Sequence, residues 1–247
     1  MSFDVQHIRA DFPVLAEIIN GQPLVYLDSA NTSQKPNAVI NAMTTFMQHA
    51  YGPTNRSAYK LASDATDAFE GARAKVAAFI NAPAVHEVVF TKNATESLNL
   101  IVRTWGTQNL NKGDVVVLTH MEHHANIVPW QMLAAEKGFT IRWVPLTEDG
   151  LLDLSDLDTL LTGAKAFSFT SMSNVLGTIN PVKELCARAH KHGAIAIVDG
   201  CQSVPHMHTD VQDWDADFVV FSSHKMVGPS GIGIMWGREN ILDSIPP

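Results

Sequence analysis

Four short stretches of the sequence place polar, chemically versatile side chains directly after apolar runs. The first stretch, Lys92 to Ser97, puts a hydroxyl and free backbone N–H groups where a helix should begin. The start of a helix favours an anion, because its orphan donors and its dipole both attract negative charge. Asn93 or Thr95 could equally be an ordinary helix cap. This stretch alone therefore leaves both interpretations open.

The second stretch, residues 120–126, contains three histidines within five positions. Such a run could hold a metal, offer a flat ring to a planar ligand, or form a partly solvated loop. A metal is not favoured, because neither this run nor the His86-Glu87 pair has the H-E-x-x-H spacing of helical zinc sites. We therefore predict no metal site.

The remaining two stretches place an acid and an amine 26 residues apart. Asp199 ends an apolar run and precedes Gly-Cys-Gln, and a buried acid without a partner is costly. A turn or a helix cap is the alternative for Asp199. Lys225 follows Ser-Ser-His and precedes glycines spaced G-x-x-G-x-G, which is not the spacing of a dinucleotide site. A lone lysine in a loop is usually solvated.

Together, the four stretches supply the parts of a site for pyridoxal 5'-phosphate. This cofactor needs an anion cradle for its phosphate, a flat neighbour for its ring and an amine for its aldehyde. It also needs an acid near its ring nitrogen, because an opposite charge close by favours the protonated form. No single stretch predicts the cofactor, but their combination does.

The elements that must position these stretches alternate between strand and helix. This alternation predicts an α/β fold with a mainly parallel seven-stranded sheet flanked by helices, whose ligands gather beyond the carboxyl ends of the strands. We expect strands at residues 87–91, 114–119, 140–144, 166–170, 194–198, 217–221 and 232–236. We expect helices at residues 37–51, 62–80, 95–105, 127–137, 155–161 and 182–192. Residues 1–22 do not fit the alternation and are assigned to an N-terminal arm or part of a small domain; residues 23–247 are assigned to a large cofactor-binding domain.

Composition argues against several kinds of partner. The chain has 17 Lys and Arg against 25 Asp and Glu, for a net charge of −8, and no basic cluster. We therefore expect no nucleic acid and no anionic membrane as a partner. No apolar run reaches the roughly 18 residues that a membrane span needs. With two cysteines and no basic, then apolar, leader at its start, the chain is expected to be cytoplasmic.

From Phe12 to Pro247 the sequence resembles the class V aminotransferase family, and within it the cysteine desulfurases of the SufS and CsdA type. The resemblance rests on residues 26–30, 34–36, 94–97, 122–130, 173–177, 199–202 and 222–225. It implies fold type I of the pyridoxal-phosphate-dependent transferases and the conversion of L-cysteine to L-alanine. It also implies a homodimer, and a sulfur left as an enzyme-bound persulfide that a sulfur-acceptor protein takes for iron–sulfur cluster assembly.

The resemblance also implies a role for individual residues. Lys225 would hold the cofactor covalently and His123 would stack on its ring, both as catalytic residues. Asp199 would face the ring nitrogen. The other implied contacts are Ala94, Thr95, Ser222 and His224 at the phosphate, Gln202 and Asn174 at the phenolic oxygen, and Ala30, Asn174 and Arg56 at the substrate.

The sequence departs from the family's pattern in several places. Relatives commonly read H-R-G-x-H where this chain has N-R-S-A-Y at residues 55–59, while Asn31 replaces a small residue and Cys201 an alanine. The family's persulfide-forming cysteine and carboxylate-binding arginine lie beyond the counterpart of Pro247. We therefore expect the C-terminal small domain to be absent and the chain by itself to be inactive.

Three alternatives stay open at this point. Cys186 or Cys201 could replace the missing nucleophile, although Cys186 lies among apolar helix positions and neither is expected to be an accessible thiolate. The chain could be another class V enzyme, that is, a lyase, epimerase or aminotransferase. It could also be a catalytically silent protein that persists as a binding partner.

Overall fold

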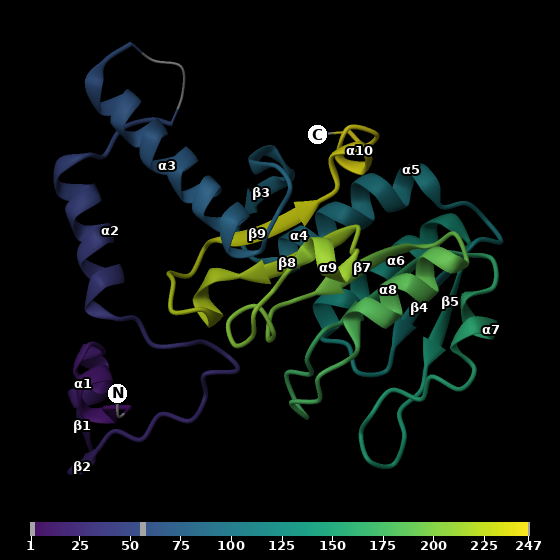
Figure 1. Cartoon of the computed structure of the whole chain (residues 1–247), viewed down its shortest axis with the longest axis horizontal. Helices are drawn as coiled ribbons and strands as arrows, with labels where there is room; N and C mark the ends of the chain where they lie inside the picture. Colours follow the sequence, from purple (N-terminus) through teal and green to yellow (C-terminus); the bar gives the residue numbers. More distant parts are fainter. Residues whose placement is uncertain (1–2, 55–57, 247) are drawn as a thin grey trace.

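A seven-stranded sheet forms the centre of the protein, with strand order β3-β9-β8-β7-β6-β4-β5 (Figure 1). The computed structural model describes residues 3–54 and 58–246. The strands are β3 (Val88–Thr91), β4 (Val115–Thr119), β5 (Thr140–Val144), β6 (Ala164–Thr170), β7 (Ile195–Asp199), β8 (Phe218–Ser222) and β9 (Gly233–Gly237). Strands β5, β4, β6, β7 and β8 pair in parallel, whereas β9 is antiparallel to both β8 and β3. The predicted α/β fold with a mainly parallel sheet is confirmed.

The central strands are apolar along their length because both faces of the sheet are covered. Successive side chains point to opposite faces. Val117 and Phe167 accordingly belong to one buried cluster, and their neighbours Val116 and Ala166 to the other. The two clusters form the core that fixes the positions of the strand ends.

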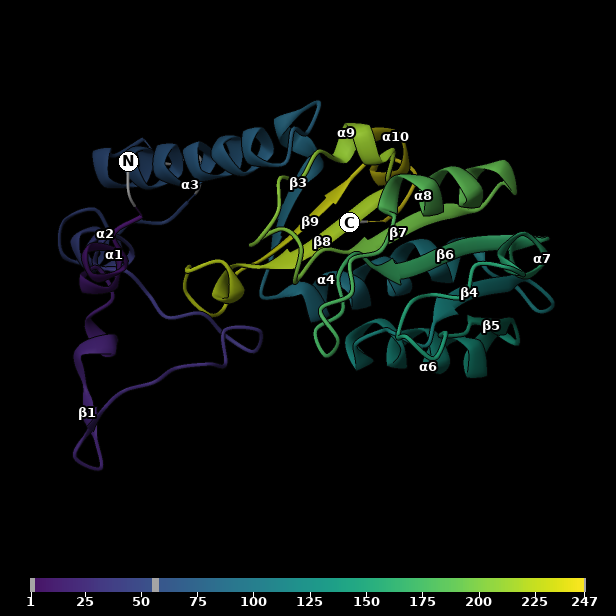
Figure 2. The same ribbon diagram turned by 60° about the horizontal axis from the view of Figure 1, so that its bottom comes forward.

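Helices cover both faces of this sheet (Figure 2). Helices α7 (Leu157–Leu161), α8 (Val182–Lys191) and α9 (Val211–Trp214), with the end of α3 (Lys60–Phe79), pack on one face. On the other face lie α4 (Ala94–Ile101), a π-helical turn at Val102–Gly106, and α6 (Val128–Lys137). The short helices α5 (Thr107–Asn109) and α10 (Glu239–Leu242) complete the set. No helix in the described part of the chain is both long and apolar enough to cross a membrane.

The N-terminal part lies apart from the sheet (Figure 1). It consists of α1 (Val5–Ala10), a 3₁₀ turn at Pro13–Ala16, the hairpin of β1 (Ile18–Ile19) and β2 (Gln22–Pro23), and α2 (Asn37–His49). None of these elements contains a buried residue. The extended segment between β2 and α2 reaches towards the sheet before the chain enters α2 (Figure 1). The division of the chain at residue 22 remains a prediction.

Most of the expected elements form within two residues of their expected bounds. Strand β6 begins at Ala164, two residues earlier than expected, and the helix expected at 95–105 continues through the π-helical turn to Asn109. The short helices α1, α9 and α10 were not expected, because four to six residues are too few to show a helical period. The sequence does indicate where α1 and α9 begin, because Asp4 and Asp210 are residues that commonly cap helices.

Gly233 on β9 allows the start of α4 to approach the sheet. A Cβ atom at this position would overlap the backbone of Asn93, which cannot move without shifting α4. We predict that Gly233→Ala lowers the free energy of unfolding by about 1–3 kcal/mol, the usual cost of overpacking. Gly71→Ala is the control, because nothing lies within 4 Å of the added methyl on α3, and it should stabilise by about 0.5–1 kcal/mol. Urea denaturation measures both; equal effects would contradict the close approach.

Candidate active site

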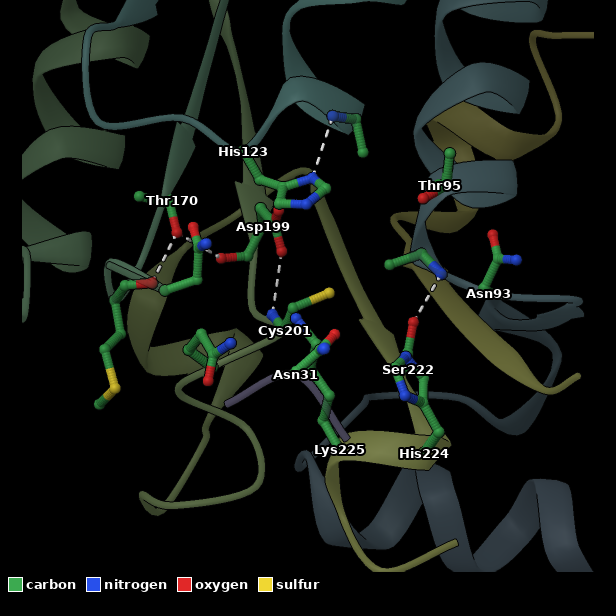
Figure 3. A pocket seen from close by; sticks show the side chains of 15 residues that line it. Asn31, Asn93, Thr95, His123, Thr170, Asp199, Cys201, Ser222, His224 and Lys225 are labelled. Carbon is green, nitrogen blue, oxygen red and sulfur yellow. Dashed lines mark hydrogen bonds between the residues drawn. The ribbon is translucent and has the colours of Figure 1, made fainter. Parts of the chain in front are cut away.

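A cavity of about 240 Å³ opens where β6, β7 and β8 end and α4 begins (Figure 3). It lies at the edge of the sheet where the sequence predicts a ligand. The residues expected to hold a cofactor all line this one cavity: Ala94, Thr95, His123, Asn174, Asp199, Gln202, Ser222, His224 and Lys225. Residues from five separate stretches of the sequence therefore meet in one place.

Asp199, the last residue of β7, lines this cavity. Its parallel partner on β8 is Val220, and the amide of Gly200 continues the pairing with a 2.8 Å bond to the Val220 carbonyl. The side chain is only 4% exposed, and one carboxylate oxygen accepts the amide of Cys201 at 2.9 Å. An acid so deeply buried favours a cation beside it.

Lys225 supplies a cation on the same cavity. It ends the 3₁₀ turn Ser223–Lys225 that directly follows β8, and it is half-buried rather than fully solvated. The charges of Asp199 and Lys225 both act on the thiol of Cys201, with opposite effects on its pKa. The amine and the acid are therefore close to one sulfur atom (Figure 3).

The start of α4 provides the anion-binding end of the cavity. Asn93 is the cap, because its Oδ1 accepts the amide of Glu96 at 2.8 Å, and Thr95 is left to face the cavity. The amide of Ala94 already donates to Ser222 Oγ at 2.8 Å. The Ser222 hydroxyl hydrogen and Thr95 are therefore better placed than the Ala94 amide to bind an anion. Burial, with the charges of Lys225 and Lys35, lowers the pKa of His224.

Of the three clustered histidines, His123 is the one that lines the cavity. Its Nδ1 accepts the amide of Ala125 at 3.1 Å, which fixes the ring and leaves the proton on Nε2. The ring of His120 instead stacks on Trp143, with centroids 5.2 Å apart. Among residues 3–54 and 58–246, no group of three metal-binding side chains is close enough to hold an ion.

Behind His123 lies a buried carboxyl group, Glu122. Its oxygens accept bonds from Thr119 Oγ1 at 2.5 Å, Asn126 Nδ2 at 2.7 Å and the Thr170 amide at 2.9 Å. Burial outweighs these donors and, together with the charge of Asp199, raises the pKa of Glu122 to about 8. A carboxyl group within the protein thus titrates far above its ordinary range.

This raised pKa makes stability depend on pH. Because folding raises the pKa of Glu122, its contribution to the free energy of unfolding is fully present below the ordinary pKa of 4.5. This contribution is lost as the pH rises towards 8. We predict that the free energy of unfolding falls between pH 5 and 8 relative to that of Glu122→Gln, by up to about 1.4 kcal/mol per pH unit. Urea denaturation of both proteins across this range measures the difference. Parallel pH curves would contradict the raised pKa.

Neither cysteine is suited to act as a nucleophile. Cys186 is buried in the core on α8, and burial raises the pKa of its thiol. Cys201 lines the cavity, but burial and the charge of Asp199 raise its pKa well above the ordinary value. Because the thiolate is the reactive form, both thiols are expected to be inert at neutral pH.

Two residues expected at the substrate lie elsewhere or cannot be placed. The Ala30 carbonyl accepts Gln202 Nε2 at 2.7 Å, so Ala30 lies beside the cavity without lining it. Arg56 falls outside the described residues. The sequence did not single out Ala125, Thr170 or Met172, which also line the cavity. Thr170 ends β6, so the rule that led to Asp199 would also have found it.

Together, the fold and the site define an α/β protein with a lysine and an acid on one cavity at the carboxyl edge of its sheet. Comparison with known proteins narrows the class. The family model described as aminotransferase class-V matches residues 25–247. The chain belongs to this family.

Three similar proteins bear the name cysteine desulfurase. A cysteine desulfurase of Pectobacterium atrosepticum is 48% identical over the whole chain, which spans 61% of that relative's length. The crystal structure of the Escherichia coli cysteine desulfurase CsdA is 37% identical, with a TM-score of 0.89 over all of this chain and 61% of that one. The apo cysteine desulfurase of Thermococcus onnurineus is also 37% identical, with a TM-score of 0.93 over all of this chain and 60% of its own.

The residues around the cavity fit pyridoxal 5'-phosphate. Hydroxyls at the start of α4 and the end of β8 suit a phosphate, and the deeply buried acid suits a protonated ring nitrogen. The amine of Lys225 on the same cavity suits the aldehyde. Class V aminotransferases are known to depend on this cofactor.

Proposed function

We propose that this chain forms the cofactor-binding portion of a cysteine desulfurase. The whole protein would use pyridoxal 5'-phosphate to convert L-cysteine to L-alanine and pass the sulfur on. The observation that carries the proposal is the convergence of Lys225, Asp199 and the start of α4 on one cavity. The whole-chain similarity to cysteine desulfurases supports the choice of reaction.

When bound, pyridoxal phosphate supplies an aldehyde that condenses with amines and a protonated ring that withdraws electrons from the substrate's α carbon. Lys225 would hold the cofactor and, once released by the substrate amine, take the proton from the α carbon. Asp199 would keep the proton on the ring nitrogen, because its buried carboxylate stabilises that charge. His123 would stack on the ring, held by its bond from the Ala125 amide.

The remaining residues would orient the cofactor and the substrate. Thr95, Ser222 and His224 would bind the phosphate, and Ala94 would join them only if Ser222 released its amide. Asn174 and Gln202 would meet the phenolic oxygen. Asn174, Ala30 and Arg56 would contact the substrate; Gln202 holds the carbonyl of Ala30 beside the cavity.

The sulfur would be received by a thiol other than Cys186 and Cys201, because burial raises the pKa of both. We propose that a sulfur-acceptor protein then takes it for iron–sulfur cluster assembly, and that the enzyme works in the cytoplasm as a homodimer. We expect no nucleic acid as a partner, because a net charge of −8 disfavours binding to a polyanion.

Covalent labelling tests the proposed role of Lys225. Incubation with pyridoxal phosphate, reduction with borohydride and peptide mass spectrometry should find one cofactor mass on the peptide that contains Lys225. Lys225→Ala should remove this label. Lys183→Ala is the control, because Lys183 is exposed and pairs with Asp213 on the opposite side of the sheet from α4.

Asp199→Asn completes this test. It keeps the size of the side chain but removes the charge, so cofactor affinity should fall by about tenfold or more, which corresponds to about 1.4 kcal/mol. Labelling spread over surface lysines, with none at Lys225, would refute the cofactor site. Labelling at Lys225 without release of alanine from L-cysteine by the full-length protein would refute the choice of reaction.

A further inference from the structure

A segment from the N-terminal part, residues 30–35, lies across the turn that carries Lys225; we call it the strap. Its donors converge on one acceptor, the backbone carbonyl oxygen of His224, the residue before Lys225. Ser33 donates to this oxygen through its amide at 2.9 Å and its hydroxyl at 3.0 Å. Thr32 Oγ1 lies 3.1 Å from it and Lys35 Nζ 3.2 Å. The contacts join positions about 190 residues apart in the sequence.

The strap also holds the other side of Lys225. The amide of Val227 donates to Ser33 Oγ at 2.7 Å, so one hydroxyl group contacts the chain both before and after the lysine. Val227 has a φ of 58°, in the left-handed region that a β-branched residue rarely adopts. Such strained backbone persists only where its surroundings hold it. Ser33 is the neighbour that accepts its amide.

The two ends of the strap are fixed by polar contacts as well. Lys35 Nζ donates to the carbonyls of Ser33 and His224, and burial lowers the pKa of this amine. At the other end, the Ala30 carbonyl accepts Gln202 Nε2 at 2.7 Å. Gln202 follows Asp199 closely in the sequence and is 5% exposed. The strap therefore links the turn that carries the amine to the turn that directly follows the acid.

Polar bonds, rather than apolar packing, attach this part of the chain. Val25 and Leu27, which precede the strap, are 74% and 90% exposed. The hydrogen bonds of Ser33 and Lys35 therefore act with those of Thr32 and Ala30 to restrain how the strap and the Lys225 turn lie relative to each other.

We propose that Ser33 and Lys35 are positioning residues that fix the Lys225 turn, so that the lysine amine stays on the cavity opposite Asp199. The proposal rests on the proposed function for the role of the amine. A covalent step requires the reacting atoms to be held in a narrow range of positions, and small displacements cost large factors in rate. Loss of either residue should therefore slow attachment of the cofactor to Lys225 more than it weakens binding.

Two measurements separate positioning from general damage. The rate of covalent attachment is followed by borohydride trapping in Ser33→Ala and Lys35→Met and should fall by about tenfold or more. The noncovalent affinity for pyridoxal phosphate is measured in double variants that combine Lys225→Ala with Ser33→Ala or Lys35→Met. This affinity should differ by less than about twofold from that of Lys225→Ala alone. Lys35→Arg, which keeps the charge and the donors, should restore most of the rate. Ser155→Ala and Lys183→Met, at exposed positions away from the cavity, should leave the rate unchanged.

Hydrogen exchange tests the strap without any cofactor. The peptide covering residues 224–228 should exchange faster in Ser33→Ala, because the Val227 amide loses its acceptor. Unchanged exchange would overturn the proposal, as would unchanged trapping or an equal loss of rate and affinity. If the unaltered protein shows no label on Lys225, the proposed function fails while exchange still decides whether the strap holds the turn.

Discussion

The site depends on the parallel pairing of β7 with β8. In this pairing, Asp199 lies beside Val220, and the chain leaves both strands at the same edge of the sheet. The acid and the amine, which are 26 residues apart in the sequence, therefore open onto one cavity. The core on both faces of the sheet holds this register, because a slip of one residue would turn every buried side chain to the wrong face.

The charges in and around the cavity favour a particular kind of ligand. Asp199 is buried with one backbone donor on its carboxylate, whereas Glu122, whose pKa burial raises to about 8, is mostly uncharged at neutral pH. At the other end, Lys225 and Lys35 add positive charge, and burial together with these two charges lowers the pKa of His224. A ligand that is cationic at one end and anionic at the other matches this separation of charge, and protonated pyridoxal phosphate has that form.

The sequence was sufficient to predict the sheet and most of the cavity, because both follow from local patterns. Apolar runs marked the seven strands, and polar residues after them marked Asp199, His123 and Lys225. The strap was beyond this reasoning, since Ser33 and His224 meet through an irregular segment with no periodic signal. The bond from the Ala94 amide to Ser222 could not be predicted either, because it joins the ends of two regular elements 128 positions apart, and no local pattern indicates such a contact.

A crystal structure of the protein with pyridoxal 5'-phosphate would show whether Lys225 and Asp199 act on the same cofactor. We expect the phosphate at the start of α4, the ring nitrogen within hydrogen-bonding distance of the Asp199 carboxylate, and density that joins the cofactor to Lys225. A cofactor bound outside this cavity, or one whose ring nitrogen faces away from Asp199, would contradict this expectation.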